Sequence, residues 1–205
     1  MTAPSLPRLD PATAPADPHE LFAEWFADAR AAGVHEPDAM ALATTTASGR
    51  PSVRMVLLRG HGPGGFCFFT GYGSRKGREL AESPFAALCF YWQQAHRQVR
   101  IEGAVARVTD AESDAYFSRR PIGSRLSAVA SPQSEVVPSR EWLEERVADL
   151  TRTHRHGEIP RPAGWGGFRL TPDAMEFWQQ AEHRLHDRIG YRRTGDGWTR
   201  ERLAP

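Results

Sequence analysis

The stretch EHRLHDRIGY, residues 182–191, places two histidines and two arginines within six residues near the end of the chain. If it is a β-strand, Arg184, His186 and Arg188 point to one face and form a row of three potential cations. Like charges in such a row repel, so we expect either a solvated edge strand or an anion or electron-rich ligand above it. His183 and His186 would chelate a metal together only from a helix, and we expect no metal site.

A second basic cluster, Ser74, Arg75 and Lys76, begins a predicted helix. Free backbone N–H groups make a helix N-terminus a site for anions, whereas basic side chains there oppose the helix dipole. Their presence suggests a negative partner such as a phosphate, with a solvated basic helix start as the alternative. The spacing of the glycines fits neither a Walker loop nor a dinucleotide fingerprint.

Two further groups could bind anions. Arg54 and Arg59 lie in an otherwise apolar strand, where each should reach a partner because an unpaired buried charge is costly. Tyr116, Arg120 and Ser124 are four residues apart, and a helix would converge two hydroxyls and a guanidinium on one oxyanion. On their own, these last three residues also fit an ordinary helix end.

Short β-like runs separated by Gly/Pro turns must position these groups, and strands so close in sequence pair antiparallel. The expected strands are residues 40–46, 52–59, 66–70, 85–92, 97–108, 166–170, 174–179, 183–193 and 197–203. Helices are expected from the N-cap Asp17 to Gly33, over 74–83, over 109–120 with a capping box, and over 139–154 with Ser139 as N-cap. The pattern predicts an α+β fold, an antiparallel barrel with peripheral helices.

Composition limits the possible partners. The chain has 205 residues and a net charge of +1, from 26 basic and 25 acidic side chains, so it lacks the basic excess of a nucleic-acid-binding protein. It shows no signal peptide and no membrane span, which predicts a cytoplasmic protein that contacts no membrane. We expect residues 1–16, rich in Pro and Ala, to form a flexible N-terminal arm, and residues 17–205 to form one domain.

From about Asp17 to Pro205, a series of ordered motifs resembles the pyridoxine/pyridoxamine 5′-phosphate oxidase family. These motifs are RMVLLR, FFTGYGSRKGREL, RQVRIEG, YFSRRPIGS, SPQSE, WGGFRL, EFWQ, HRLHDRIGY and RLAP. The resemblance implies an antiparallel split β-barrel of the FMN-binding type, assembled as a homodimer with FMN at the subunit interface. It also implies oxidation of pyridoxine 5′-phosphate or pyridoxamine 5′-phosphate to pyridoxal 5′-phosphate, with O2 as acceptor and H2O2 as product.

The resemblance also assigns roles to individual residues. FMN contacts are implied for Arg54, Met55, Val56, Leu57, Leu58, Phe69, Thr70, Arg75, Lys76, Gln98, Gln133, Ser134, Trp178 and Arg188. Substrate contacts are implied for Arg59, Tyr116, Arg120, Ser124, Arg184 and His186, of which Arg184 and His186 are also the implied catalytic residues. Arg59 stands where the family usually has lysine, a change that keeps the charge and alters the geometry.

Two other functions are compatible with much of the same pattern. One is a flavin oxidase of the phenazine-biosynthesis type, which acts on a tricyclic substrate without a phosphate. The other is a split-barrel protein that binds flavin without turnover. Tyr116, Arg120 and Ser124 favour the oxidase of phosphorylated B6 vitamers, because that substrate alone brings a phosphate for them.

Overall fold

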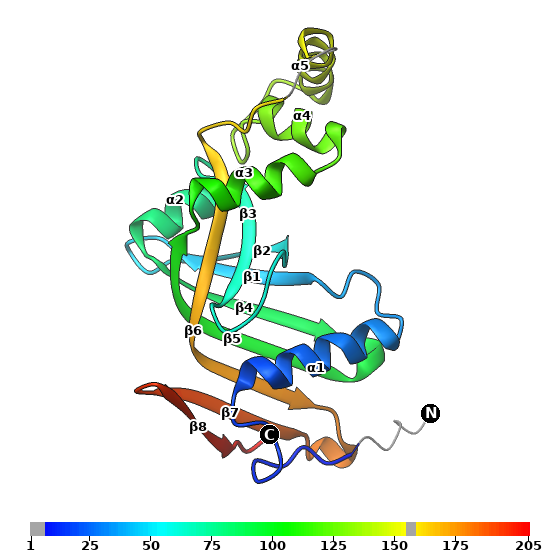
Figure 1. Ribbon diagram of the computed structural model, residues 1–205, viewed down its shortest axis with the longest axis vertical. Coiled ribbons are helices and arrows are strands. Elements are labelled where there is room, and N and C mark those ends of the chain that lie inside the picture. The colour runs from blue at the N-terminus through cyan, green and yellow to red at the C-terminus, as the bar shows by residue number, and fades with distance from the viewer. Residues whose placement is uncertain (1–6, 155–158) are drawn as a thin grey trace.

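The computed structural model describes residues 7–154 and 159–205 (Figure 1). Within these ranges, eight antiparallel strands form one sheet surrounded by helices, which confirms the expected α+β class. The strand order is β2-β1-β4-β5-β6-β7-β8, and β3 pairs with β6. The strands are β1 (Ala39–Thr45), β2 (Pro51–Leu57), β3 (Phe66–Gly71), β4 (Phe85–Trp92), β5 (Arg97–Arg107), β6 (Trp165–Gln179), β7 (Asp187–Thr194) and β8 (Gly197–Arg202).

The long strand β6 connects the two halves of the sheet (Figure 1). Its first residues pair with β3, its last residues pair with β7, and β5 runs along both parts. The sequence predicted two separate strands, 166–170 and 174–179, and this prediction is wrong. Pro172 lies inside β6, opposite Gly103, where the pairing register shifts. The irregularity accommodates a residue that cannot donate to the ladder, so the strand continues.

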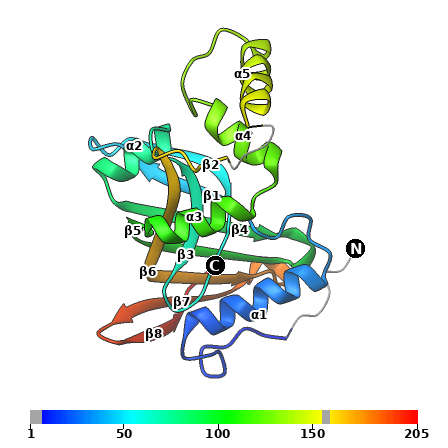
Figure 2. The ribbon, with the colours of Figure 1, turned by 45° about the horizontal axis from the view of Figure 1, so that its top comes forward.

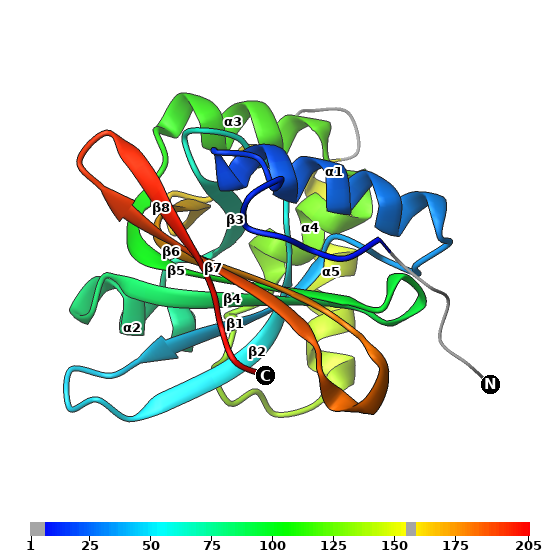
Figure 3. The same ribbon diagram turned by 90° about the horizontal axis from the view of Figure 1, so that it is seen from below.

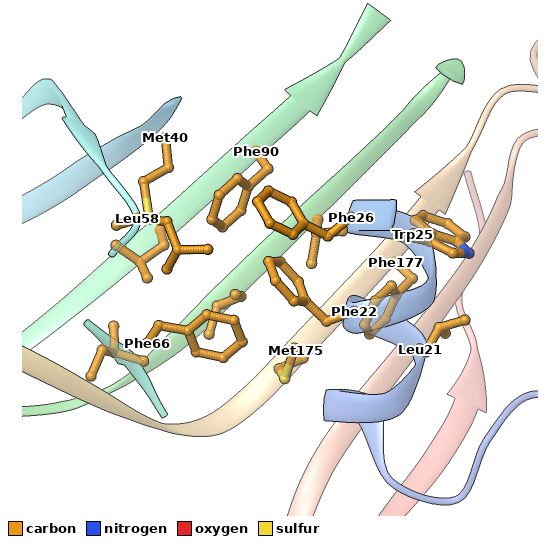
Figure 4. Close-up of a cluster of buried hydrophobic side chains, with 14 of the residues drawn as sticks. Leu21, Phe22, Trp25, Phe26, Met40, Leu58, Phe66, Phe90, Met175 and Phe177 are labelled. Atoms are coloured by element: carbon orange, nitrogen blue, oxygen red, sulfur yellow. The ribbon is translucent and has the colours of Figure 1, made fainter. Parts of the chain in front are cut away.

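Helix α1 (Pro18–Ala31) covers one side of the sheet and supplies much of the core. It begins, as predicted, at the N-cap Asp17, whose carboxylate accepts a hydrogen bond from the backbone of residue 19. Phe22 is fully buried, with its ring centroid 4.8 Å from that of Phe66 and 5.2 Å from that of Phe90. Figure 4 shows these rings together with Trp25. The site described below therefore rests on a rigid aromatic core.

Three other helices lie where the sequence predicted them, and a fourth was not foreseen. Helices α2 (Arg75–Glu82), α3 (Asp110–Arg119) and α5 (Arg140–Thr153) begin at side-chain caps, which are Ser74, Thr109 and Ser139. Helix α4 (Ile122–Ala130) follows Pro121. Together α4 and α5 project beyond the sheet (Figures 1 and 2). No helix in the described ranges is long and apolar enough to cross a membrane.

The expected N-terminal arm, residues 1–16, is described from Pro7 onward, and residues 1–6 lie outside the described ranges. The described part runs beside β7 (Figure 3). The Leu9 backbone N–H donates to Asp187 at 3.2 Å, and Tyr191 Oη donates to the Pro15 carbonyl at 2.9 Å. Leu9 belongs to the main core. Residues 7–16 thus make specific contacts with the sheet, and the boundary at residue 17 stays a prediction.

His19 makes stability depend on pH. Its ring stacks on Phe66 at 5.6 Å, and neither ring nitrogen has a hydrogen-bond partner among the described residues. Burial lowers the pKa of His19 below its ordinary value of 6.5, and this effect outweighs the opposing charge of Asp17. The unfolded chain therefore takes up a proton first as the pH falls, and stability contributed by neutral His19 is lost progressively below pH 6.5.

We expect the free energy of unfolding to fall between about pH 7.5 and pH 5.5, by at most about 1.4 kcal/mol per pH unit for each such histidine. Replacing His19 by phenylalanine should reduce this loss, whereas the same change at the exposed His35 should not. Urea unfolding at both pH values measures the effect. Equal pH slopes for His19→Phe and the unmodified protein would contradict this assignment.

Candidate functional site

A cavity of about 260 Å³ lies where the end of β2, strand β3 and helix α3 meet. It brings together residues far apart in the sequence, most of them implied by the family resemblance. The lining residues are Met55, Val56, Leu57, Arg59, Phe69, Thr70, Lys76, Tyr116, Arg120, Gln133 and Trp165. A larger cavity of about 620 Å³ shares Arg120, Gln133 and Trp165 with it. The two cavities therefore lie next to each other.

One side of the cavity is the start of helix α2. A Cβ on Gly77 would lie 2.3 Å from the Tyr72 carbonyl oxygen, so only glycine allows the helix to approach the end of β3 this closely. Lys76 is only 7% exposed, and its ammonium donates to Thr70 Oγ1 at 3.2 Å. Burial, and then the charge of Arg54, lower the pKa of Lys76. A solvated basic helix start is therefore excluded for Lys76, although Arg75 is exposed.

Arg54 confirms the expectation that a charge in this apolar strand has a partner. Its Nη2 atom lies 3.1 Å from Glu79 Oε2, and Arg75 Nε donates to Glu79 Oε1 at 2.9 Å. Thr44 and Ser52 also donate to Glu79. Burial would raise the pKa of Glu79, but these hydrogen bonds hold it at about 2. Glu79 is thus ionised at neutral pH.

The loop after α4 closes the same region. Gln133 Oε1 accepts hydrogen bonds from Thr70 Oγ1 at 2.7 Å and from the Gly71 backbone N–H at 3.0 Å. Ser134, the next residue, has a φ of +73°, in the left-handed region. A serine held in this conformation is under backbone strain, which is common at ligand-binding loops. The amide of Gln133 therefore lies fixed at the cavity wall.

Within residues 7–154 and 159–205, no carboxylate forms an ion pair with Arg120. Its Nη1 atom is buried and makes no hydrogen bond to the described residues, and its guanidinium lies 4.8 Å from the centre of the Trp165 ring. Burial lowers the pKa of Arg120. The charge of Tyr116 would raise this pKa, and the positive charge of Arg59 lowers it further. Tyr116 itself stacks on Phe69, with ring centroids 3.9 Å apart. This corner of the cavity is suited to an anion.

Ser124 does not join Arg120 in the way its spacing suggested. Helix α3 ends at Arg119, Arg120 adopts an extended backbone, and Ser124 lies in α4, beyond Pro121. One helix thus does not align these side chains, because proline restricts the preceding residue to extended conformations, and Arg120 instead stands at the end of α3, which was the other interpretation of the sequence. Ser124 does not line the 260 Å³ cavity, and its role in binding stays a prediction. Leu58 lies in the main core (Figure 4).

A second group of implied site residues lies on β5, β6 and β7. Gln98 is opposite Trp178, which is opposite Arg188, so the three form one cross-strand row. Arg188 Nε donates to Glu176 at 2.9 Å, and its Nη1 donates to the Ala204 carbonyl at 2.6 Å. None of the three lines the cavity described above. Within a single chain, the two groups remain separate.

The row of Arg184, His186 and Arg188 predicted for a strand is wrong. Residues Glu182–Arg184 form a short 3₁₀ turn, and β7 begins only at Asp187. His183 and Arg184 have φ values of +55° and +62°, in the left-handed region, which is incompatible with a strand. The exposed Arg184 is consequently presented from a strained turn. Such strain is often retained where it serves a function.

His186 lies against Trp178, with ring centroids 4.6 Å apart. Its Nδ1 atom accepts a hydrogen bond from the Ala181 backbone N–H at 3.2 Å. The neutral ring therefore carries its proton on Nε2, which makes Nε2 the donor toward any ligand. Among residues 7–154 and 159–205, no group of three or more His, Cys, Asp or Glu side chains could hold a metal ion.

Three residues that shape the site were given no role by the family resemblance. Glu79 is four residues after Arg75, a spacing that predicts an ion pair on a helix. Trp165 carries no comparable signal, and only the fold places it beside Arg120. Arg161 binds Asp110 and Asp114 and donates to the Trp165 carbonyl at 2.6 Å. These contacts hold Trp165 in position against α3.

Comparison with known proteins identifies related sequences over most of the chain. Residues 26–154 match the family described as "Pyridoxamine 5'-phosphate oxidase". Residues 165–205 match the family described as "Pyridoxine 5'-phosphate oxidase C-terminal dimerisation region". The second match includes Trp178 on β6, Arg188 on β7 and the strained turn between those strands.

Curated proteins named "Pyridoxine/pyridoxamine 5'-phosphate oxidase" are similar over nearly the whole chain. The protein of Rubrobacter xylanophilus is 53% identical over 92% of this chain and 87% of its own length. That of Novosphingobium aromaticivorans is 52% identical over 93% of this chain and 94% of its own length. The similarity thus covers both groups of candidate site residues.

Among solved structures, PhzG from Burkholderia lata in complex with tetrahydrophenazine-1-carboxylic acid has a TM-score of 0.93 and 35% identity, and 98% of each chain is covered. A pyridoxamine 5'-phosphate oxidase-related, FMN binding protein from Nostoc punctiforme has a TM-score of 0.73 and 19% identity, covering 96% of this chain and all of the other. The latter likeness concerns the fold alone. Both support the expected split-barrel architecture.

Proposed function

The chain belongs to the pyridoxamine 5′-phosphate oxidase family, and from this premise we propose that the cavity between β2, β3 and α3 binds FMN and a phosphorylated B6 vitamer. The protein is an FMN-dependent enzyme that oxidises pyridoxine 5′-phosphate or pyridoxamine 5′-phosphate to pyridoxal 5′-phosphate. One observation carries the assignment of the site. Two separate cationic groups border one recess, which suits one phosphate from the cofactor and one from the substrate.

The first cationic group fits the phosphate of FMN. It consists of Arg75 and Lys76 on the first turn of α2 and Arg54 on β2, and the start of the helix adds backbone N–H groups. Lys76 is buried, and among the described residues its ammonium donates a hydrogen bond only to the hydroxyl of Thr70, so an anion would offset the cost of its burial. The amide of Gln133 and the backbone of residues 55–57 would then border the rest of the flavin.

The second cationic group fits the phosphate of the substrate. Arg120 provides a buried guanidinium N–H without a partner in the described chain, and Tyr116 provides a hydroxyl beside it. Arg59 lines the same cavity and pairs with Asp38 at 2.7 Å. Because this pair is partly exposed, Arg59 can exchange Asp38 for a phosphate at low cost. Arginine at this position also permits a two-point contact that lysine lacks.

When bound, FMN would supply a two-electron acceptor for a hydride equivalent from the C4′ carbon of the substrate, with O2 as the final acceptor and H2O2 as the product. The residues of the chain supply position and charge. Arg184 and His186 would orient the substrate, with the Nε2–H of His186 available to donate a hydrogen bond. The two cationic groups fix the phosphates, so the reacting carbon is held at one place.

A second copy of the chain would complete the site. Gln98, Trp178 and Arg188 do not line the cavity of their own chain, and the last two lie in the matched dimerisation region. Met55 and Leu185 are exposed apolar side chains beside the cavity and beside the strained turn, respectively. We infer that each cavity of the homodimer receives this row, together with Arg184 and His186, from the partner subunit.

An oxidase of the phenazine-biosynthesis type is the second candidate, because the PhzG structure is similar over 98% of the chain. Its bound molecule, as named, is a carboxylic acid without a phosphate. Arg120 and Arg59 suit a phosphate better, since two guanidinium groups can share its several oxygens. Dependence of turnover on the substrate phosphate distinguishes the two functions.

The decisive test is turnover in air. FMN-loaded protein mixed with pyridoxine 5′-phosphate should form the aldehyde and H2O2 in equal amounts. Pyridoxine without the phosphate should react at least about a hundredfold less efficiently, because a charged contact worth roughly 3 kcal/mol is missing. If neither product appears while FMN stays bound, the proposed function is wrong. Equal rates with and without the phosphate would refute the assignment of Arg59 and Arg120.

A further inference from the structure

Glu79 is a buried carboxylate directly behind the cationic group at the start of α2. It is 4% exposed, and both of its oxygens are used. Oε2 accepts hydrogen bonds from Thr44, Ser52 and Arg54, and Oε1 accepts one from Arg75. A carboxylate with this many donors has a fixed position and fixes its partners in turn.

The guanidinium groups of Arg54 and Arg75 are held from different directions. Arg54 enters from strand β2 and also donates to the Leu42 carbonyl at 3.0 Å. Arg75 is on the first turn of α2, and its side chain is 61% exposed. Without Glu79, this exposed side chain would have many rotamers to lose on binding an anion. Glu79 therefore joins a strand residue and a helix residue into one rigid arrangement.

Glu79 also sets the charge of the group. Arg54, Arg75 and Lys76 carry three positive charges, and the one carboxylate leaves a net charge of +2. A phosphate monoester at neutral pH carries a charge close to −2. The carboxylate thus limits repulsion among the three cations before the ligand arrives, and the remaining charge matches a dianion.

We propose that Glu79 is a positioning residue for the phosphate of FMN, acting through Arg54 and Arg75 without touching the ligand. This inference rests on the proposed function, which assigns the start of α2 to that phosphate. The inference goes beyond the proposed function because it gives a negatively charged residue a role in a site that binds an anion. Carboxylates placed behind metal ligands act in the same way, and their removal typically costs about 10-fold to 100-fold in affinity.

Riboflavin provides the test, because it is FMN without the phosphate. Flavin fluorescence titration of the full-length protein, freed of flavin, gives the Kd of each compound. The Kd of riboflavin divided by the Kd of FMN isolates the contribution of the phosphate. The change Glu79→Gln should reduce this ratio about tenfold and leave the Kd of riboflavin nearly unchanged. Glu82→Gln, on the exposed side of the same helix, removes one charge and should leave the ratio unchanged.

The outcomes separate this inference from the proposed function. If the unmodified protein binds FMN and riboflavin equally, the phosphate site at α2 is wrong. If it prefers FMN and Glu79→Gln has the same ratio or a larger one, Glu79 does not position the phosphate contacts. Should Glu79→Gln fail to fold, Glu79→Asp keeps the charge but cannot reach both arginines, and it should also reduce the ratio. An unchanged ratio in that variant would overturn the proposal.

Discussion

Replacing Arg120 by methionine is expected to reduce kcat/KM for pyridoxine 5′-phosphate by roughly a hundredfold or more, mainly through KM. The buried guanidinium N–H has no partner among the described residues, and a phosphate would give it one. Losing a desolvated, charged contact of this kind costs about 3 kcal/mol. The Kd of FMN should change little, because its phosphate is assigned to the start of α2. Steady-state kinetics and flavin titration measure the two effects.

The same change should cost the protein little stability. An unsatisfied buried N–H is itself unfavourable by about 1–3 kcal/mol, which offsets the loss of the contact between Arg120 and the Trp165 ring. We expect the free energy of unfolding to change by less than about 1 kcal/mol. Arg119→Met, at the exposed neighbouring position, serves as the control and should retain kcat/KM. A large loss of stability with an unchanged KM would show that Arg120 is structural.

The helices were predictable because their signals are local. Asp17, Ser74, Thr109 and Ser139 each cap the helix that the sequence assigned to them, and a cap requires only the residues of one turn. Helix α4 was missed because Pro121 ends one helix and begins another without a polar cap. A proline at this point is compatible with a turn as well as with a helix start.

The errors in the strands come from non-local contacts. Pro172 suggests a break when the sequence is read alone, but Gly103 on β5 absorbs the irregularity, and β6 continues for 15 residues. Before β7, the sequence instead predicted a strand where the structure has a turn. Alternation suggested a strand through Arg184, whereas the backbone enters the left-handed region at His183 and Arg184. Arginine gives no signal for this conformation, and histidine, although enriched at positive φ, adopts it too rarely to predict a turn.

The candidate site shows the same division between local and tertiary information. Sequence indicated the basic start of α2, and the resemblance implied most residues that line the cavity. The contacts that hold these residues could not be predicted from the sequence. Glu79 reaches Arg54 because α2 packs against β1, which pairs with β2, and Trp165 reaches Arg120 because the start of β6 packs against α3. Such contacts depend on the fold, since the partners are far apart along the chain.

Replacing Arg184 by alanine is expected to slow reduction of the bound flavin by pyridoxine 5′-phosphate by on the order of a hundredfold. Arg184 projects from a strained turn beside His186, and both would face the substrate in the partner subunit's cavity. The Kd of FMN should change less than about threefold, because no phosphate contact is removed. Stopped-flow absorbance without oxygen measures the reduction step by itself.

His183→Ala is the matched control, because His183 is exposed, precedes Arg184 and has nearly the same backbone conformation, with φ of +55° against +62°. Alanine at either position leaves the strain in place, so a difference between the two variants reports on the arginine side chain. Flavin reduction should be nearly normal in His183→Ala. If both variants slow reduction equally, the turn matters only for its shape. If Arg184→Ala loses FMN as strongly as it loses activity, Arg184 holds the cofactor and does not orient the substrate.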